Sequence, residues 1–129
     1  MATSIQRMIN SRIGAAGATV VIGLIVITPF CGLLFDCGCS WPWAGLESNC
    51  NFHKGGAAYR CPWCEYPVAG LGSTLLAVCS GVLAALLGLG RDGQVATRTL
   101  EGMAVFLIAG ILLGWLTAIF TGYPTFLLY

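Results

Sequence analysis

Three long stretches of this sequence contain no charged residue, and they constrain the fold more than any other feature. They cover residues 13–35, 66–90 and 102–129. Each is longer than the ~20 residues that an α-helix needs to cross the hydrocarbon core of a bilayer. Only 9% of all residues are charged, against roughly 25% in an average soluble domain. The sequence therefore predicts an all-α integral membrane protein with three transmembrane helices.

The first apolar stretch follows Arg7 and Arg12, as the apolar region of a cleavable signal peptide also would. Such a region has about 7 to 15 residues and precedes a cleavage site with small residues. Here the stretch runs over residues 13–35, and its small residues, Gly14 to Ala18, stand at its start. We interpret it as an uncleaved membrane anchor.

Lysine and arginine next to the predicted spans indicate their orientation, because such residues stay on the cytoplasmic side. The ends that we place inside carry Arg7, Arg12, Arg91 and Arg98. The loop that we place outside carries Lys54 and Arg60. The predicted segments are a cytoplasmic N-terminus (1–12), the first helix (13–35), an extracytoplasmic Cys-rich loop (36–65), the second helix (66–90), a cytoplasmic loop (91–101), the third helix (102–122) and an extracytoplasmic C-terminus (123–129).

Small residues recur at every fourth position of the second and third predicted helices, on a face where another backbone can approach closely. The stripe of the second helix is Ala69, Ser73, Ala77, Gly81 and Ala85. The stripe of the third is Gly110, Gly114, Ala118 and Gly122. Two interpretations stay open: the stripes pack the three helices together, or they bind other membrane subunits. Lipid or other subunits must cover the rest of the helix surfaces.

Several function classes are disfavoured by what the sequence lacks. The predicted spans contain no Asp, Glu, Lys, Arg or His, whereas proton and ion pathways usually need such residues. The net charge of +1 does not suit a nucleic-acid-binding protein, which needs a basic face. Cys64 is followed by Glu65 and not by histidine, so the motif for covalent haem c attachment is missing.

The loop at 36–65 concentrates five of the seven cysteines and the only histidine of the chain. They form three short pairs: Cys37-x-Cys39, Cys50-x-x-His53 and Cys61-x-x-Cys64. Thiolates and imidazole at this spacing are ligands for zinc or copper. A zinc site takes four ligands, for which we favour Cys50, His53, Cys61 and Cys64. Cys37 and Cys39 would then be spare, or would help to hold a second ion.

Disulfide bonding is the alternative chemistry for this loop, and it is expected if the loop faces an oxidising compartment. A structural version staples the loop and needs no cofactor. A catalytic version uses Cys61 and Cys64 as a redox pair, since one thiol of a CxxC motif often has a lowered pKa. Residues 61–66 are loosely similar to the CxxC segment of the DsbB-type quinone-linked thiol oxidases. The likeness is confined to these residues and does not extend to the number of spans, so we do not infer membership of that family.

We therefore expect a small accessory subunit of a larger membrane protein complex, non-catalytic, with a loop that binds a metal or is stapled by disulfides. The first alternative is a membrane thiol-disulfide oxidoreductase that uses Cys61 and Cys64. The last is a metal uptake protein in which Cys31 and Cys79 relay the ion through the helices.

Overall fold

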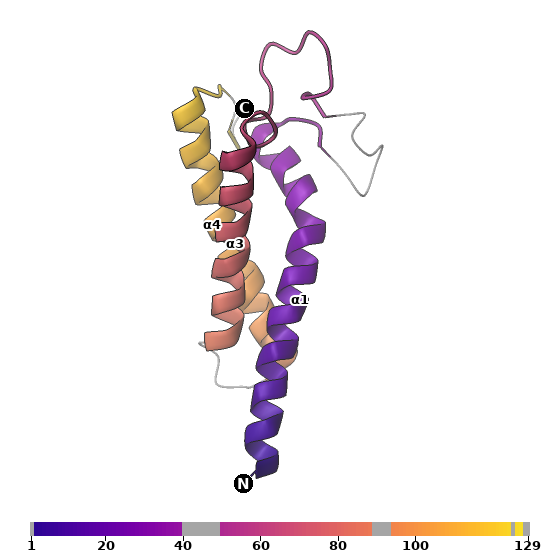
Figure 1. Cartoon of the computed structure of the whole chain (residues 1–129), viewed down its shortest axis with the longest axis vertical. Helices are drawn as coiled ribbons and strands as arrows, with labels where there is room; N and C mark the ends of the chain where they lie inside the picture. Colours follow the sequence, from indigo (N-terminus) through magenta and orange to yellow (C-terminus); the bar gives the residue numbers. More distant parts are fainter. Residues whose placement is uncertain (1, 40–49, 89–93, 125, 128–129) are drawn as a thin grey trace. The chain divides into compact units, whose positions relative to one another are not determined.

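The computed structural model describes residues 2–39, 50–88, 94–124 and 126–127 of the chain (Figure 1). The elements in this part of the chain are helical: α1 (Ala2–Phe35), α2 (Pro62–Glu65), α3 (Pro67–Leu87) and α4 (Val95–Thr121). No β-strand occurs among the described residues. The expected all-helical architecture is confirmed for this part of the chain.

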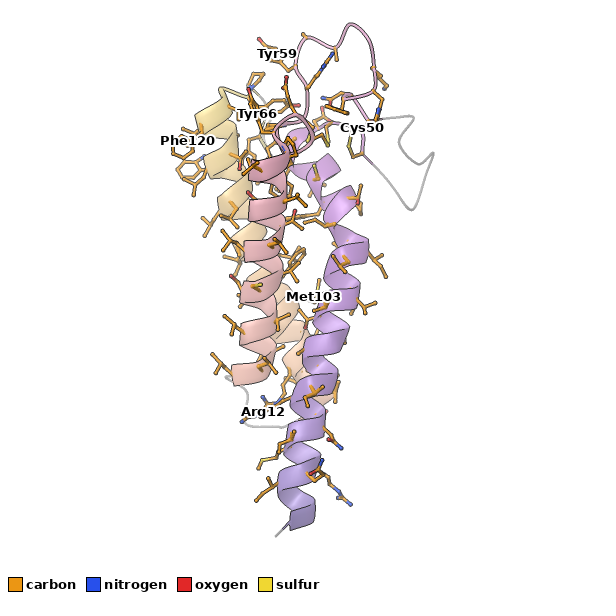
Figure 2. All side chains as sticks on the ribbon, in the orientation of Figure 1. Arg12, Cys50, Tyr59, Tyr66, Met103 and Phe120 are labelled. Atoms are coloured by element: carbon orange, nitrogen blue, oxygen red, sulfur yellow. A yellow bond between two sulfur atoms is a disulfide. The ribbon has the colours of Figure 1, made fainter. Side chains whose placement is uncertain are left out.

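The helices α1, α3 and α4 are each long and apolar enough to cross a membrane. The shortest, α3, has 21 residues, which at 1.5 Å per residue extend over about 30 Å, the thickness of a hydrocarbon core. Large apolar side chains on these helices are exposed, including Leu33 (69%), Val68 (86%) and Phe120 (85%). Figure 2 shows Phe120 projecting from α4. Surfaces of this kind suit a nonpolar surrounding.

Two of the helices begin before the apolar stretches that predicted them. The helix α1 begins at Ala2 and α4 begins at Val95, so α1 includes Arg7 and Arg12, and α4 includes Arg98 and Glu101. Arg7 and Arg12 are exposed, whereas Arg98 is only 8% exposed. At the other end of α1 the helix passes Pro29 and stops after Phe35, where Asp36 takes a left-handed backbone angle (φ 46°).

Close packing divides the chain into two compact units. The first unit consists of Met1–Leu24 and Leu76–Ala109. Its helices meet at two glycines: a Cβ atom on Gly81 would lie 2.7 Å from the carbonyl oxygen of Gly102, and one on Gly102 would lie 2.7 Å from Oγ1 of Thr19. Both distances are much shorter than a van der Waals contact, so only glycine permits this approach of the backbones. The part of the α3 stripe that lies in the first unit, with Gly81 and Ala85, therefore packs against other helices of this chain.

The second unit consists of Ile25–Leu75 and Gly110–Tyr129 and contains most of the cysteines. Its centre is Phe35, which is fully buried at the end of α1. The Phe35 ring meets Trp63, Tyr123 and Phe126 edge-on, with ring centroids 5.4, 5.6 and 5.9 Å apart. Edge-to-face pairs at this separation stabilise the fold in addition to the stabilisation that comes from the apolar area they bury. This aromatic group joins the end of α1 to the short helix α2 and to the chain that follows α4.

Candidate metal centre

The end of α1 brings two cysteines together that lie six residues apart. Cys31 lies near the end of the helix, and Cys37 follows the left-handed turn at Asp36. The Sγ atoms of Cys31 and Cys37 are 4.0 Å apart, and the Cys37 thiol also donates to the carbonyl oxygen of Cys31 at 3.6 Å. Asp is one of the few residues with a side chain that tolerates a left-handed backbone. The turn at Asp36 thus folds the chain back over the helix end.

A third cysteine reaches the same place from the far side of the loop. Cys61 precedes Pro62, the first residue of α2, and proline favours this first position of a helix because its missing N–H is not needed there. The Cys61 Sγ atom lies 3.3 Å from that of Cys31. Cys31, Cys37 and Cys61 are 6%, 1% and 0% exposed, and their three Sγ atoms all lie within 4.8 Å of one another. We call these three residues the inner sulfur group.

Asn51 connects the two loop segments that carry Cys37 and Cys61. Its backbone N–H donates to the carbonyl oxygen of Cys37 at 2.8 Å, and its side-chain oxygen accepts from the backbone N–H of Cys61 at 3.0 Å. The side-chain nitrogen donates to the carbonyl oxygen of Tyr59 and to the hydroxyl of Tyr123. The Asn51 side chain therefore satisfies backbone groups of residues 59–61, and the Asn51 backbone satisfies Cys37. These groups would otherwise lose their hydrogen bonds on leaving water.

Cys64 lies at the edge of the inner sulfur group. It follows Cys61 by one turn of α2 and is partly exposed. Hydrogen bonds from the thiols of Cys31 and Cys61, together with a smaller effect of the charge of His53, outweigh burial and lower the pKa of Cys64 to about 3. Among the described cysteines outside the inner sulfur group, it is the one whose thiol is tied to two members of that group.

The thiols of Cys37, Cys61 and Cys64, which we call the cluster together with Cys31, differ in pKa. Hydrogen bonds from the thiols of Cys31 and then of Cys61 lower the pKa of Cys37 to about 4. The hydrogen bond with Cys31 also lowers the pKa of Cys61, but its bonds to Cys37 and Cys64, together with burial, raise that pKa well above its usual range. Thiolate is the form that binds metals and acts as a nucleophile. Cys37 and Cys64 are therefore the thiols of this cluster that ionise most readily.

A disulfide bond joins Cys39 to Cys50 next to the inner sulfur group. Their Cα atoms are 4.5 Å apart, and the bond encloses residues 40–49, which lie outside the described part of the chain. The Sγ atoms of Cys37, Cys39 and Cys50 all lie within 4.8 Å of one another, and all three residues are buried. We call these three residues the outer sulfur group. Figure 2 shows Cys50 on the loop beyond the ends of the helices.

The expected ligands are only partly brought together. The loop cysteines Cys37, Cys39, Cys50 and Cys61 all enter one of the two sulfur groups. His53 enters neither of them and is exposed, with its ring 5.1 Å from that of Phe52. Cys61 and Cys64, the pair expected to be redox-active, are free thiols in this structure. Cys79 is exposed on α3 and enters neither group.

Two residues of the site were not among the ligands expected from sequence. Cys31 lies in the first predicted span, where the sequence suggests only a part in an ion relay. The signal for its role was its position near the loop end of that span, close enough to Cys37 for a helix-ending turn to join them. Asn51 carries no such signal, because an asparagine beside a cysteine is common in loops.

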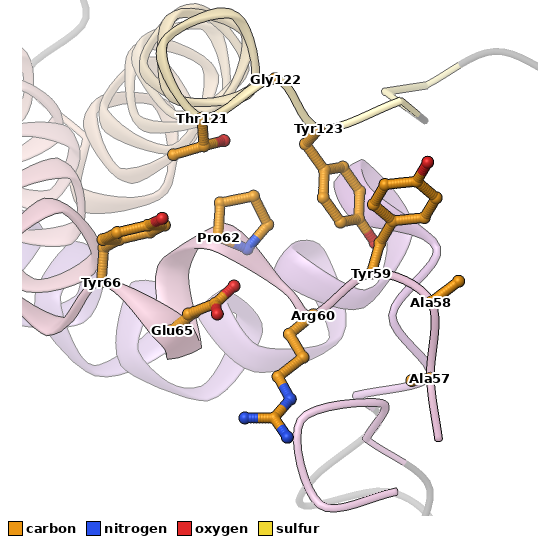
Figure 3. A pocket seen from close by; sticks show the side chains of 10 residues that line it. All are labelled: Ala57, Ala58, Tyr59, Arg60, Pro62, Glu65, Tyr66, Thr121, Gly122 and Tyr123. Atoms are coloured by element: carbon orange, nitrogen blue, oxygen red, sulfur yellow. The ribbon is translucent and has the colours of Figure 1, made fainter. Parts of the chain in front are cut away.

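A pocket of about 260 Å³ opens beside α2. Its walls come from the loop, from α2 and from the end of α4, and Figure 3 shows Pro62 between Tyr66 and Tyr123. Arg60 and Glu65 also line the pocket. Arg60 precedes Cys61 and Glu65 follows Cys64 in the chain, so the pocket lies beside the helix that begins after Cys61 and carries Cys64.

No protein-family model, no curated protein and no solved structure matches this chain.

Proposed function

We propose that this chain is a small multi-pass membrane protein that binds a transition metal ion, zinc or copper, through the thiolates of Cys31, Cys37 and Cys61. The observation that carries the proposal is the inner sulfur group: three buried Sγ atoms within 4.8 Å of one another. Soft sulfur ligands select zinc and copper(I) over harder ions such as magnesium or calcium.

The spacing of these sulfur atoms suits a common ion. A zinc ion binds each cysteine sulfur at about 2.3 Å, so the sulfurs of a tetrahedral site lie about 3.8 Å apart. The separations of 3.3 Å between Cys31 and Cys61 and of 4.0 Å between Cys31 and Cys37 lie on either side of that value. Small side-chain rotations would therefore place the three sulfurs around one ion.

The number of ligands distinguishes the two candidate metals. Zinc in a closed structural site takes four ligands, and Cys64 is the candidate for the fourth, because it is a free thiol whose pKa is affected by Cys31 and Cys61. Copper(I), a soft ion, is satisfied by sulfur ligands alone, and the inner sulfur group offers three. In both cases the partly exposed Cys64 is the thiol through which an arriving ion would first contact the cluster.

The exposed apolar faces of α1, α3 and α4 support insertion into a bilayer. The predicted orientation places the N-terminus in the cytoplasm and the sulfur groups on the extracytoplasmic side, at the end of the helices that carries Lys54 and Arg60. A site at that surface would take its ion from the extracytoplasmic space. Metal binding would also contribute to folding of the loop, because the ligands come from segments far apart in sequence.

We further propose that the chain serves as an accessory subunit of a larger membrane complex. An accessory role is favoured over transport, because most of each apolar helix lacks Asp, Glu, Lys, Arg and His and the chain is small. The stripe of small residues on α3 is occupied by contacts within the chain, so partner subunits would contact the outward faces of the helices. Co-purification from native membranes, followed by blue-native electrophoresis, should yield a complex larger than the chain; a monomer alone would argue against this role.

The decisive experiment is elemental analysis of the detergent-purified chain, with free thiols counted after denaturation in acid. The structure has five free cysteines and one disulfide. We expect stoichiometric zinc or copper with five thiols in the wild type, and the same metal content with four thiols in Cys79→Ser. Absence of metal after reconstitution with both zinc and copper(I) would refute the proposal.

A thiol-disulfide oxidoreductase is the second candidate, and one observation favours it. The thiol of Cys37 lies within 4.8 Å of both sulfurs of the Cys39–Cys50 disulfide. Attack of the Cys37 thiolate on Cys39 would form a Cys37–Cys39 bond and release Cys50 as a thiolate, which moves the disulfide within the chain without net oxidation. Net oxidation would need an external dithiol, which becomes a disulfide as the bond in the chain is reduced to two thiols. Acid trapping with maleimide and peptide mapping would detect the exchanged bond. If Cys39–Cys50 is the sole disulfide found, before and after incubation at neutral pH, this candidate fails.

A further inference from the structure

The thiol of Cys37 belongs to both sulfur groups. It lies with Cys31 and Cys61 in the inner sulfur group, and with Cys39 and Cys50 in the outer one. All five cysteines are less than 9% exposed. Two sets of three buried sulfurs therefore share one atom, and they differ in one respect: two members of the outer set are bonded to each other.

We propose that the outer sulfur group is a second, redox-gated site for a soft metal ion, copper(I), with Cys37 as the ligand that bridges both ions. The proposal rests on the proposed function, since Cys37 can bridge two ions only if the inner sulfur group also holds one. With the disulfide intact, the outer group has one free thiol and binds no ion. Once the disulfide is reduced, the outer group offers three thiols and accepts the second ion.

The reduction is a two-electron step that an external dithiol supplies. The dithiol gives two electrons and two protons, and its own sulfurs form a disulfide. The Cys39–Cys50 bond breaks, and each of these residues becomes a thiol. On metal binding the thiols give up their protons to solvent. No other co-reactant is needed.

The outer site does not depend on the disulfide for its shape. The backbone N–H of Asn51 donates to the carbonyl oxygen of Cys37, which keeps the residue after Cys50 beside Cys37. The backbone of Cys39 packs on Gly32, where the carbonyl oxygen of Cys39 occupies the space that a Cβ atom would need. Neither contact involves the sulfur atoms of the disulfide, so on reduction the sulfurs of Cys39 and Cys50 need only separate enough to admit an ion.

The separation of the sulfurs is within the range that one ion can bridge. Two bonds of about 2.3 Å to the same ion allow sulfurs up to about 4.6 Å apart. The outer group is confined to 4.8 Å, and its sulfurs can rotate about their Cα–Cβ bonds. Thiolates are soft ligands, which favours copper(I), and a thiolate has further lone pairs with which Cys37 can bind a second ion.

The test is the copper(I) stoichiometry of the full chain in detergent, measured anaerobically by titration against a coloured copper(I) chelator. One sample keeps its disulfide; the other is reduced with dithiothreitol and desalted. We expect one ion per chain before reduction and two after it. One ion in both samples would overturn the second site and leave the proposed function standing. No ion in either sample would overturn both.

Substitutions test whether Cys37 is shared, with Cys79→Ser as the matched control because Cys79 lies in neither group. In reduced samples, Cys50→Ser should lose only the outer ion and Cys61→Ser only the inner one. Cys37→Ser should lose both, while Cys79→Ser keeps two. Retention of an ion by Cys37→Ser at wild-type affinity would overturn the bridge. Far-ultraviolet circular dichroism checks that each variant keeps its helices, and the wild-type comparison stands without any variant.

Discussion

The Sγ atoms of Cys31 and Cys61 lie 3.3 Å apart although thirty residues separate them in the chain. One thiol belongs to an apolar helix and the other to the start of a short helix beyond the loop. Their contact joins the end of α1 to the far side of the loop within the second unit. It makes Cys31, a residue of a predicted span, part of a site that the sequence placed entirely in the loop.

Replacement of Cys31 should therefore weaken metal binding more than replacement of any exposed cysteine. Loss of a residue that merely orients a ligand typically lowers metal affinity about 10- to 100-fold, so Cys31→Ser should lower it by more than about 100-fold. Cys79→Ser removes a thiol of the same kind outside the cluster and should leave affinity unchanged. Competitive titration with zinc and with copper(I) measures both. Equal affinity in the two variants would exclude Cys31 as a ligand.

Asn51→Ala should loosen the site without removing a sulfur. The change leaves the buried backbone N–H of Cys61 without its acceptor, at a cost of about 1–3 kcal/mol. We expect faster alkylation of Cys61 by maleimide in the metal-free chain. Asn51→Asp keeps the acceptor oxygen and removes only the donor to Tyr59 and Tyr123. A smaller increase in rate for Asn51→Asp than for Asn51→Ala would identify the bond to Cys61 as the important one.

Alkylation of Cys64 should persist into mildly acidic solution. An ordinary thiol with a pKa near 8.5 loses reactivity about a thousandfold between about pH 8 and about pH 5. The pKa of Cys64 is lowered to about 3, chiefly by hydrogen bonds from Cys31 and Cys61, so its thiolate survives over that range. The measurement is the rate with iodoacetamide in metal-free Cys79→Ser, with the modified residue identified by mass spectrometry. A thousandfold decrease at Cys64 would contradict the prediction.

The same ionisation should make the loop less stable in acid. A group whose pKa is lower in the folded than in the unfolded chain contributes stability that is complete above the unfolded pKa and is lost as pH falls through the folded pKa. For Cys37 and Cys64, with pKa values of about 4 and about 3, that loss is complete only near pH 3. Protease sensitivity of the metal-free loop should thus rise as pH falls toward this value. The variant Cys64→Ser should show a smaller rise.

The aromatic group around Phe35 should contribute more to stability than any one hydrogen bond of the loop. Trp63 is 7% exposed, and its Nε1–H donates to Oγ1 of Thr117 at 3.3 Å. Trp63→Ala removes a buried ring and should destabilise by about 3–5 kcal/mol. Trp63→Phe keeps a ring against Phe35 and loses the hydrogen bond, at about 1 kcal/mol. Thermal unfolding in detergent should rank the variants in this order.

Gly81→Ala and Gly72→Ala should have opposite effects although both lie in α3. At Gly81 the new Cβ atom would meet the backbone of Gly102, whereas nothing lies within 4 Å of a Cβ atom at Gly72. We expect Gly81→Ala to destabilise by about 1–3 kcal/mol and Gly72→Ala to stabilise by up to about 1 kcal/mol. Equal thermal stability of the two variants would show that the close approach at Gly81 is not needed.

The helices that can cross a membrane were predictable because hydropathy is a property of contiguous residues. A stretch such as 66–90 is apolar whatever the rest of the chain does, and α3 lies within it. The small residues at Ala77, Gly81 and Ala85 follow the helical repeat, so their common face could also be predicted. That this face packs within the first unit depended on where Thr19 and Gly102 lie, which no local pattern contains.

The cysteine cluster shows the same division between local and distant information. The sequence by itself determined that sulfur ligands gather at one end of the apolar helices, because Cys37, Cys39, Cys50, Cys61 and Cys64 are all in one loop. Only the tertiary structure decided that Cys31 joins them, that Cys39 pairs with Cys50, and that His53 enters neither sulfur group. Those outcomes depend on the turn at Asp36, on the hydrogen bonds of Asn51 and on the burial of Phe35. The turn at Asp36 is local, but the hydrogen bonds of Asn51 and the packing around Phe35 join segments distant in sequence. Spacing along a chain does not specify which distant atoms meet.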